Sequence, residues 1–193
     1  MSIDTTQANR ESGHFAEHQE LWLFGYGSLI YKAGFDYLRR APATITGWQR
    51  RFWQGSHDHR GTPDAPGRVA TLVEAPGQVC LGMAYRITPA VFDHLDHREK
   101  NGYLRFVTPM RFADGDIEDG LVYIATPDNA AWLGDASVDA IAGQIQLSTG
   151  PSGPNRDYLL QLDKALRELG ADDTHVAAIA ARLRERMAAE PGV

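Results

Sequence analysis

Cysteine is nearly absent from this sequence: Cys80 is the single cysteine among 193 residues. One cysteine excludes an intrachain disulfide framework and a zinc site built from cysteines. Cys80 lies in an apolar, strand-like run over residues 78–85. We therefore predict that it is a small core residue, because a catalytic thiolate needs an exposed, electropositive setting that the neighbouring sequence does not offer.

Long apolar segments are absent as well. No run approaches the roughly 18 apolar residues of a membrane-spanning helix. The first ten residues are polar and lack the apolar core of a signal peptide. These features predict a cytoplasmic protein with no membrane partner.

Basic residues are fewer than acidic residues, and they form no long run in the sequence. The chain has 19 Lys and Arg against 25 Asp and Glu, a formal net charge of -6. A protein that binds nucleic acid mainly through its phosphates needs the opposite sign, so we expect no nucleic-acid partner. Arg50 and Arg51, next to Phe52 and Trp53, are better explained by stacking at a pocket wall or core edge than by binding of single strands.

The order of the predicted elements indicates an α+β protein. We expect strands over residues 21–24, 43–53 (interrupted at Gly47), 69–74, 79–87, 103–112 and 118–125, with a hairpin turn at Ala75-Pro76-Gly77. We expect a short helix opened by Thr88-Pro89 and longer helices over residues 137–147, 155–169 and 173–187. Strands first and helices later predict a mostly antiparallel sheet that curls into a small barrel. Residues 1–20 are expected to form a flexible polar arm, and residues 21–193 a single domain.

A tight turn follows the first predicted strand, at Phe24-Gly25-Tyr26-Gly27-Ser28-Leu29. The dinucleotide-binding and nucleophile-elbow patterns both fail, because Ile30 stands where each requires a glycine. Successive backbone N–H groups at such a turn can hold a carboxylate. A purely structural turn is the alternative.

Ionisable residues crowd between Asp93 and Tyr103. A solvated helix end with salt bridges explains them, and so does one carboxylate acting as a general acid and base. The spacing does not choose between Asp93, Asp96 and Glu99. Histidines at 57, 59, 94 and 97 have no spacing that fixes a third ligand, so surface histidines are expected and no metal site.

Several segments together resemble the ChaC family of glutathione-specific γ-glutamylcyclotransferases, from about Leu21 to about Leu169. The segments are residues 24–30, 51–56, 58–61, 66–69, 95–103 and 150–153, in the family's order. The resemblance implies a γ-glutamylcyclotransferase-like fold, a small mixed β-barrel flanked by helices. It implies conversion of glutathione to 5-oxoproline and cysteinylglycine without metal or cofactor.

The resemblance also implies the site residues. The turn would bind the γ-glutamyl end of the substrate through Phe24, Gly25, Tyr26, Gly27, Ser28 and Leu29. The family's catalytic glutamate falls on Glu99. Three alternatives stay open: a cyclotransferase for other γ-glutamyl amides, a non-catalytic γ-glutamyl-binding module, and a metal-dependent hydrolase using the histidines. The sequence does not determine the oligomeric state.

Overall fold

The computed structural model describes residues 4–13, 20–91, 94–96 and 102–189. The chain divides into two compact units. The first comprises residues 1–49 and 72–130, and the second comprises residues 50–71 and 131–193. The expectation of a single domain over residues 21–193 stays a prediction.

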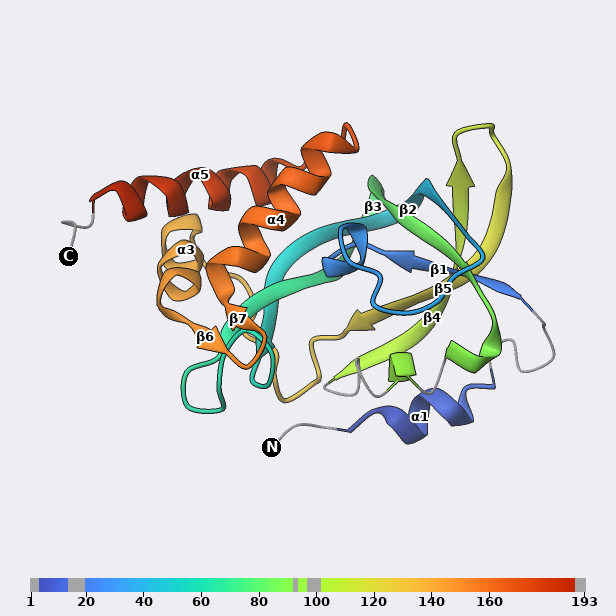
Figure 1. Cartoon of the computed structure of the whole chain (residues 1–193), viewed down its shortest axis with the longest axis horizontal. Helices are drawn as coiled ribbons and strands as arrows, with labels where there is room; N and C mark the ends of the chain where they lie inside the picture. Colours follow the sequence, from blue (N-terminus) through green and yellow to red (C-terminus); the bar gives the residue numbers. More distant parts are fainter. Residues whose placement is uncertain (1–3, 14–19, 92–93, 97–101, 190–193) are drawn as a thin grey trace. The chain divides into compact units, whose positions relative to one another are not determined.

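A closed five-stranded barrel is the main sheet of the fold (Figure 1). Its strands are β1 (Leu21–Gly25), β2 (Arg39–Ser56), β3 (Gly67–Ile87), β4 (Tyr103–Phe112) and β5 (Ile117–Ala125), in the order β1-β3-β2-β4-β5. The barrel is mixed, because β1 pairs with β3 in antiparallel and with β5 in parallel orientation. The prediction of an α+β fold with a small mixed barrel is confirmed.

Apolar strand residues explain why the barrel closes. Every residue of β1 is buried, and so are the last six residues of β5. One core cluster of the first unit comprises Leu21, Leu23, Tyr85, Ile87, Leu95, Leu121 and Tyr123. Burial of these side chains removes apolar surface from water and fixes β1 between its two partners.

The predicted hairpin at Ala75-Pro76-Gly77 is wrong. The structure has one continuous strand, β3, through this segment. Gly77 adopts a φ of 81°, and a Cβ atom there would meet nothing within 4 Å. Proline and glycine inside a strand mark a bend or bulge as often as a reversal, and here the chain continues forward.

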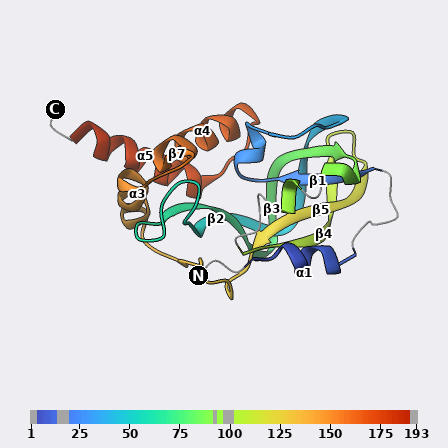
Figure 2. The ribbon, with the colours of Figure 1, turned by 60° about the horizontal axis from the view of Figure 1, so that its bottom comes forward.

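A short helix lies within the expected polar arm. Helix α1 (Thr6–Glu11) contacts β4, and the views of Figures 1 and 2 both show it beside that strand. Asn9 is 1% exposed, because its side chain hydrogen-bonds the backbone of β4 in both directions. Tertiary hydrogen bonds hold α1 against β4, and the polar sequence of this segment does not predict them.

The described residues of the first unit also contain the single-turn 3₁₀ helices η1 (Ser28–Ile30) and η2 (Pro89–Val91), and residues 94–96 are helical. Helix η2 begins at Pro89, as the Thr88-Pro89 pair predicted. The prediction of Cys80 as a core residue is confirmed, since its side chain is buried.

Helices and a small two-stranded sheet form most of the second unit. The elements are α3 (Val138–Leu147), β6 (Thr149–Gly150), β7 (Gly153–Pro154), α4 (Asn155–Glu168) and α5 (Thr174–Ala189). Ser137 caps α3 by accepting the N–H of Ala140, and Gly170 ends α4 with a φ of 74°. All three predicted long helices are confirmed.

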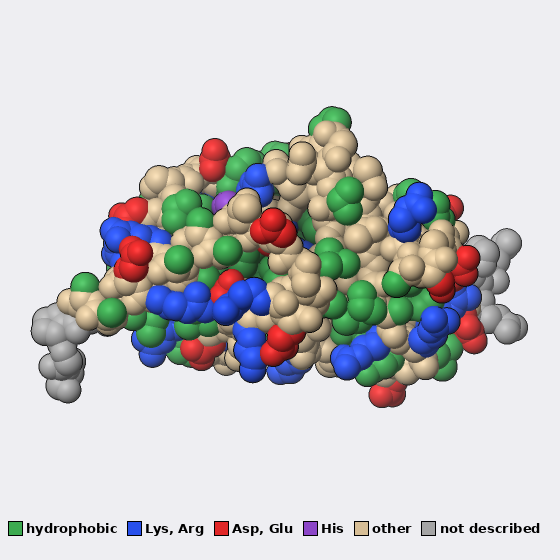
Figure 3. All heavy atoms as spheres, turned by 90° about the horizontal axis from the view of Figure 1, so that it is seen from above, with side chains coloured by type: hydrophobic (Ala, Val, Ile, Leu, Met, Phe, Trp, Pro, Cys, Tyr) green, Lys and Arg blue, Asp and Glu red, His purple; other side chains and the backbone are tan. Residues whose placement is uncertain are grey.

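Ion pairs connect the exposed sides of these helices. Arg182 and Arg186 of α5 contact Asp139 of α3, and the hydrogen bond from Arg182 lowers the pKa of that carboxyl. Basic and acidic side chains accordingly lie interspersed on the face shown in Figure 3. Such exposed pairs contribute little to stability, and burial of the helices' apolar sides contributes more. Among the helices of the described ranges, none has the length and apolar character that a bilayer crossing requires.

Candidate active site

The turn after β1 runs from buried residues into half-buried ones. Phe24 is 1% exposed and Tyr26 6% exposed, whereas Gly27, Ser28 and Leu29 are half-buried. A Cβ atom on Gly25 would lie 2.4 Å from the Cβ of Leu29, so only glycine allows the chain to turn this tightly. The groups that a ligand can reach are therefore those of residues 27–29.

Backbone N–H groups of this turn are available. Gly27 precedes η1, and its carbonyl accepts the N–H of Ile30. Within the part of the chain that the structure describes, the N–H groups of Gly27 and Leu29 donate to no hydrogen bond. Gly27 has a φ of -118°, outside the left-handed region.

Two tyrosines fix the turn to neighbouring strands. The Tyr85 hydroxyl of β3 donates to the carbonyl oxygen of Leu29, 2.6 Å away. The Tyr26 hydroxyl donates to the carbonyl oxygen of Tyr123 in β5, 2.7 Å away. The barrel therefore holds the turn from two sides.

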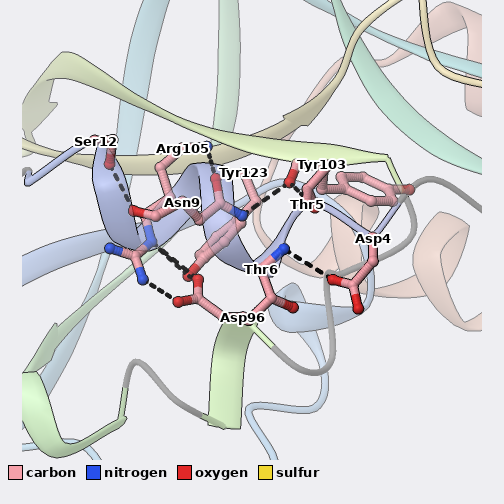
Figure 4. A network of polar contacts seen from close by, with 9 residues as sticks. All are labelled: Asp4, Thr5, Thr6, Asn9, Ser12, Asp96, Tyr103, Arg105 and Tyr123. Atoms are coloured by element: carbon pink, nitrogen blue, oxygen red, sulfur yellow. Dashed lines mark hydrogen bonds and ion pairs between the residues drawn. The ribbon is translucent and has the colours of Figure 1, made fainter.

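Of the three candidate carboxylates, the structure describes one. Glu99 and Asp93 lie outside the described residues. Asp96 is buried and forms an ion pair with Arg105 of β4, which binds both carboxylate oxygens (Figure 4). The Tyr123 hydroxyl donates to Oδ1 of the same carboxylate at 2.7 Å. Asp96 is thus engaged with Arg105 and Tyr123.

Burial and the contacts within the cluster together set the pKa values of Arg105 and Tyr123. Burial by itself lowers the pKa of Arg105, but Tyr123 and Asp96 outweigh it and raise that pKa above its ordinary value. Burial and the hydrogen bond to Asp96 raise the pKa of Tyr123. Arg105 is therefore a permanent cation, and Tyr123 remains a neutral hydroxyl that can donate to the carboxylate.

Two of the resembling segments meet within the second unit. The backbone N–H of Ser152 donates to the carbonyl of His59 at 2.9 Å, and Arg60 donates to the carbonyl of Pro154 at 3.1 Å. A Cβ atom on Gly61 would lie 2.1 Å from the N atom of Gly67, and one on Gly150 would lie 2.4 Å from the oxygen of His59. Close backbone packing explains Gly61 and Gly150, and Gly153 adopts a φ of 99°.

The residues around Arg50 form a third set of contacts, also in the second unit. Arg50 pairs with Asp173, and the backbone N–H of Phe52 donates to Nε2 of His175 at 3.0 Å. The Phe52 ring packs against Tyr158 of α4. These contacts place Arg50 and Phe52 at a packed interior, in line with the core-edge interpretation.

No metal site emerges where the structure describes the chain. Among residues 4–13, 20–91, 94–96 and 102–189, no three His, Cys, Asp or Glu side chains lie together in a way that would hold a metal ion. His59 is exposed and lies 3.3 Å from the Ser152 hydroxyl.

Comparison with known proteins places these features in a family. The family model described as ChaC-like protein matches residues 21–186. The chain belongs to the ChaC-like family. Gamma-glutamylcyclotransferase 2-3 of Arabidopsis thaliana is 47% identical over 176 residues, covering 85% of this chain and 88% of the relative. The glutathione-specific gamma-glutamylcyclotransferase of Saccharomyces cerevisiae is 36% identical over 204 residues, covering 79% and 88% of the two chains.

A solved structure of this family has the same fold. The crystal structure of a selenomethionine-labelled yeast γ-glutamyl cyclotransferase specific to glutathione matches with a TM-score of 0.80 at 33% identity. The match covers 87% of this chain and 97% of the yeast chain. The ChaC-like barrel and its helices are therefore shared over nearly the whole length of that protein.

The partners of Asp96 were not predicted from the sequence. Arg105 and Tyr123 lie in strands that were correctly predicted. The sequence pattern did not indicate that either side chain binds a buried carboxylate. An arginine inside a strand that is expected to be half-buried is itself a signal, because a buried guanidinium needs a carboxylate or several carbonyl oxygens. Asn9 gave no such signal, since polar residues near a chain end are common.

Proposed function

We propose that this ChaC-like protein is a glutathione-specific γ-glutamylcyclotransferase that converts glutathione to 5-oxoproline and cysteinylglycine. The observation that supports this most is the match, over nearly full length in sequence and in structure, to yeast proteins named for that specificity. The N–H groups of Gly27 and Leu29, which donate to no hydrogen bond within the described residues, suit a small anionic substrate held by backbone N–H groups.

The chemistry is an intramolecular transfer. The α-amine nitrogen of the γ-glutamyl residue attacks the γ-carbonyl carbon, and a new C–N bond closes the five-membered lactam. The amide bond to the cysteinyl nitrogen breaks, and that nitrogen leaves as an amine. One proton moves from the attacking nitrogen to the leaving nitrogen, so no water is consumed and neither an enzyme nucleophile nor a cofactor is required.

Two parts of the chain carry the proposed roles. The N–H groups around Gly27 and Leu29 hold the α-carboxylate of the substrate, within the binding segment Phe24–Leu29. Glu99 takes the proton from the amine and returns it to the leaving nitrogen, which suits a carboxylate whose pKa lies near the working pH. Holding the amine against the carbonyl supplies much of the acceleration.

The same proposal places the protein in the cytoplasm. A chain with a single cysteine has no disulfide framework, and this is typical of proteins from reducing compartments. Glutathione is the small-molecule partner, and no nucleic acid or membrane partner is proposed.

Purified protein incubated with glutathione tests the function directly. We expect 5-oxoproline and cysteinylglycine in equal amounts by mass spectrometry. Glu99→Gln keeps the size of the side chain but carries no proton, so kcat should fall by roughly 10²–10⁴ while the fold is retained. Near-normal turnover by a folded Glu99→Gln protein would falsify the role of Glu99.

Substrate analogues separate the proposal from its nearest alternative. N-acetylglutathione should not react, because its α-nitrogen is no longer nucleophilic. A general γ-glutamyl amide cyclotransferase would process γ-glutamyl-alanine as fast as glutathione. Absence of any product from both glutathione and γ-glutamyl-alanine, with binding of glutathione retained, would leave only the non-catalytic module.

A further inference from the structure

Three arginines are buried among the residues that the structure describes, and one of them has no carboxylate partner. Arg50 forms an ion pair with Asp173. Arg105 forms one with Asp96. Arg68 of the second unit is 7% exposed and forms no ion pair with a carboxylate of the described ranges. A buried charge without a counter-ion is unfavourable, because it loses hydration that neutral partners restore only in part.

Neutral oxygens occupy the N–H groups on one side of the Arg68 guanidinium. Nε donates to Oε1 of Gln144 at 2.7 Å. Nη1 donates to the carbonyl oxygen of Phe52 at 3.0 Å and to that of Gly134 at 2.9 Å. A guanidinium carries one N–H on Nε and two on each Nη. Both N–H groups of Nη2 therefore remain, and within the described part of the chain they donate to no hydrogen bond.

Nη2 lies at the open end of this arginine. It is not one of the fully buried side-chain atoms that lack a hydrogen-bond partner in the described chain, so it reaches solvent. The residues around this end agree with that position, since Gln144 and Gly134 are half-buried and Asp135 is exposed. A small ion can therefore approach Nη2, although the rest of Arg68 is enclosed.

The backbone of Arg68 is held as firmly as its side chain. Oδ1 of Asn155 accepts the N–H of Arg68 at 2.7 Å, and Nδ2 of Asn155 donates to the carbonyl of Arg68 at 2.9 Å. Asn155 is itself 0% exposed. The guanidinium is thus fixed before any ligand arrives, and a ligand that binds it does not have to order a long, flexible side chain.

The charge of Arg68 is only partly compensated by its surroundings. Burial lowers the pKa of this guanidinium, and the carboxylate of Asp135 raises it only in part. Arginine nevertheless remains a cation at neutral pH. An anion at Nη2 would supply the opposite charge that the three neutral oxygens do not.

We propose that Nη2 of Arg68 binds a small oxyanion from the solvent, either a carboxylate or a phosphate. Its two N–H groups donate to the oxygens of the anion in charge-assisted hydrogen bonds. Asp135 opposes this binding, because its carboxylate carries the same charge as the ligand. The inference goes beyond the proposed function and does not depend on it, since its test measures binding and not turnover.

Isothermal titration calorimetry with inorganic phosphate, and separately with acetate, tests the inference. Sodium chloride is adjusted so that the ionic strength stays constant, because salt screens charge interactions. We expect a Kd of about 1–10 mM for at least one of the two anions, as suits a few charge-assisted hydrogen bonds. The anion that binds more tightly identifies the ligand as a phosphate or a carboxylate. Arg68→Gln removes the cation and should abolish the binding, and circular dichroism reports whether this variant folds.

Two further variants keep Arg68 and change only the charge beside it. Gln144→Glu places a carboxylate at Nε, so a counter-ion is supplied internally and the affinity should fall by about tenfold or more. The carbonyl of Pro66 loses the Gln144 donor but still accepts the Ser148 hydroxyl, so the fold should be retained. Asp135→Asn removes the opposing charge at an exposed position and should raise the affinity by about threefold.

Arg182→Gln is the matched control. Arg182 is an exposed arginine of α5 in the same unit, and its partners are Asp139 and Glu185. The variant lowers the positive charge of the unit by one and leaves Arg68 and its contacts unchanged. Its affinity for phosphate and acetate should stay within about twofold of that of the unchanged protein.

The outcomes are distinguishable. Absence of binding of both anions up to about 50 mM overturns the inference, because a fixed cation with two donors should bind more tightly than that. An unchanged affinity in folded Arg68→Gln or in Gln144→Glu overturns it too, and so does weaker binding in Asp135→Asn. If Arg68→Gln does not fold, the two variants that keep the arginine decide. Phosphate or acetate binding as expected, without any product from glutathione, would contradict the proposed function and leave this inference standing.

Discussion

The hydroxyl of Tyr26 lies 2.7 Å from the carbonyl oxygen of Tyr123 and donates a buried hydrogen bond to it. Tyr26→Phe removes the donor and leaves the carbonyl without it, which should lower the free energy of unfolding by about 1–2 kcal/mol. If the turn binds the γ-glutamyl group, KM for glutathione should rise several-fold. Melting curves and initial rates measured on one preparation check both effects.

Tyr37→Phe serves as the comparison for that variant. Tyr37 is 43% exposed and packs edge-on against Tyr85 through its ring, which phenylalanine retains. Its melting temperature and KM should match those of the unchanged protein. An unaltered KM in Tyr26→Phe would count against the turn as the binding element.

Close packing at Gly61 predicts a large loss of stability. A Cβ atom there would come within 2.1 Å of the N atom of Gly67 and 2.6 Å of the carbonyl oxygen of Ser56. Gly61→Ala forces the backbone of a loop to move, and we expect a loss of about 2–4 kcal/mol in urea unfolding. In Gly143→Ala the new Cβ faces the flexible guanidinium of Arg186 at 3.2 Å, so helix propensity should make that control neutral or slightly stabilising.

Helix α1 should contribute to stability through Asn9. The Asn9 amide donates to the carbonyl of Tyr103 at 3.0 Å, and its Oδ1 accepts the N–H of Arg105 at 2.9 Å. Asn9→Ala loses both bonds, although the carbonyl of Tyr103 still accepts the hydroxyl of Thr5 at 2.8 Å, so the free energy of unfolding should fall by about 1–2 kcal/mol. Gln7→Ala, on the exposed side of the same helix, should change it by less than about 0.5 kcal/mol.

Acid should destabilise the second unit through His175. Burial, and next the nearby Arg51, lower the pKa of this imidazole from 6.5 to about 4, and Nε2 accepts the N–H of Phe52. Between these two pH values the unfolded chain binds more protons than the folded chain, so the free energy of unfolding falls as the pH is lowered from 6.5 to 4. We expect the free energy of unfolding to fall by about 1–2 kcal/mol, which is less than the full pKa shift implies, because the ring is partly solvated.

Urea unfolding at several pH values measures that loss. Asp173, Asp135 and Arg50 also contribute to the electrostatics of the ring, so a comparison variant is needed. His175→Gln keeps an acceptor for the Phe52 N–H but does not titrate. An equally steep acid dependence in His175→Gln would show that other groups are responsible.

Local signals predicted the elements whose ends are defined by local chemistry. The Ser137 side chain caps α3 by accepting a backbone N–H of the first turn. Gly170 ends α4 because glycine, without a side chain, readily adopts a positive φ. The hairpin predicted at Ala75-Pro76-Gly77 was wrong because the outcome there depends on contacts distant in the sequence. The sequence contains a residue that can bend the chain, but pairing with other strands decides whether the chain reverses or continues.

The candidate site could be predicted only in part, because a residue's contact partners in the folded chain can lie far from it in the sequence. The pattern marked Asp93, Asp96 and Glu99 alike. Asp96 differs because β4 brings Arg105 to it and β5 brings Tyr123, and both contacts exist only after the barrel closes. The resemblance to ChaC proteins favoured Glu99 by family pattern, and in the structure the Asp96 carboxylate is buried and held by Arg105 and Tyr123.

The burial of Cys80 bears on the proposed function, because the proposed substrate, glutathione, is a thiol. Thiol–disulfide exchange proceeds through an accessible thiolate, and the Cys80 side chain is 4% exposed inside β3. The folded chain therefore resists mixed-disulfide formation with oxidised glutathione, although the sequence contains a sulfhydryl. Glutathionylation of this protein consequently requires opening of the structure around Cys80 as well as an oxidising environment.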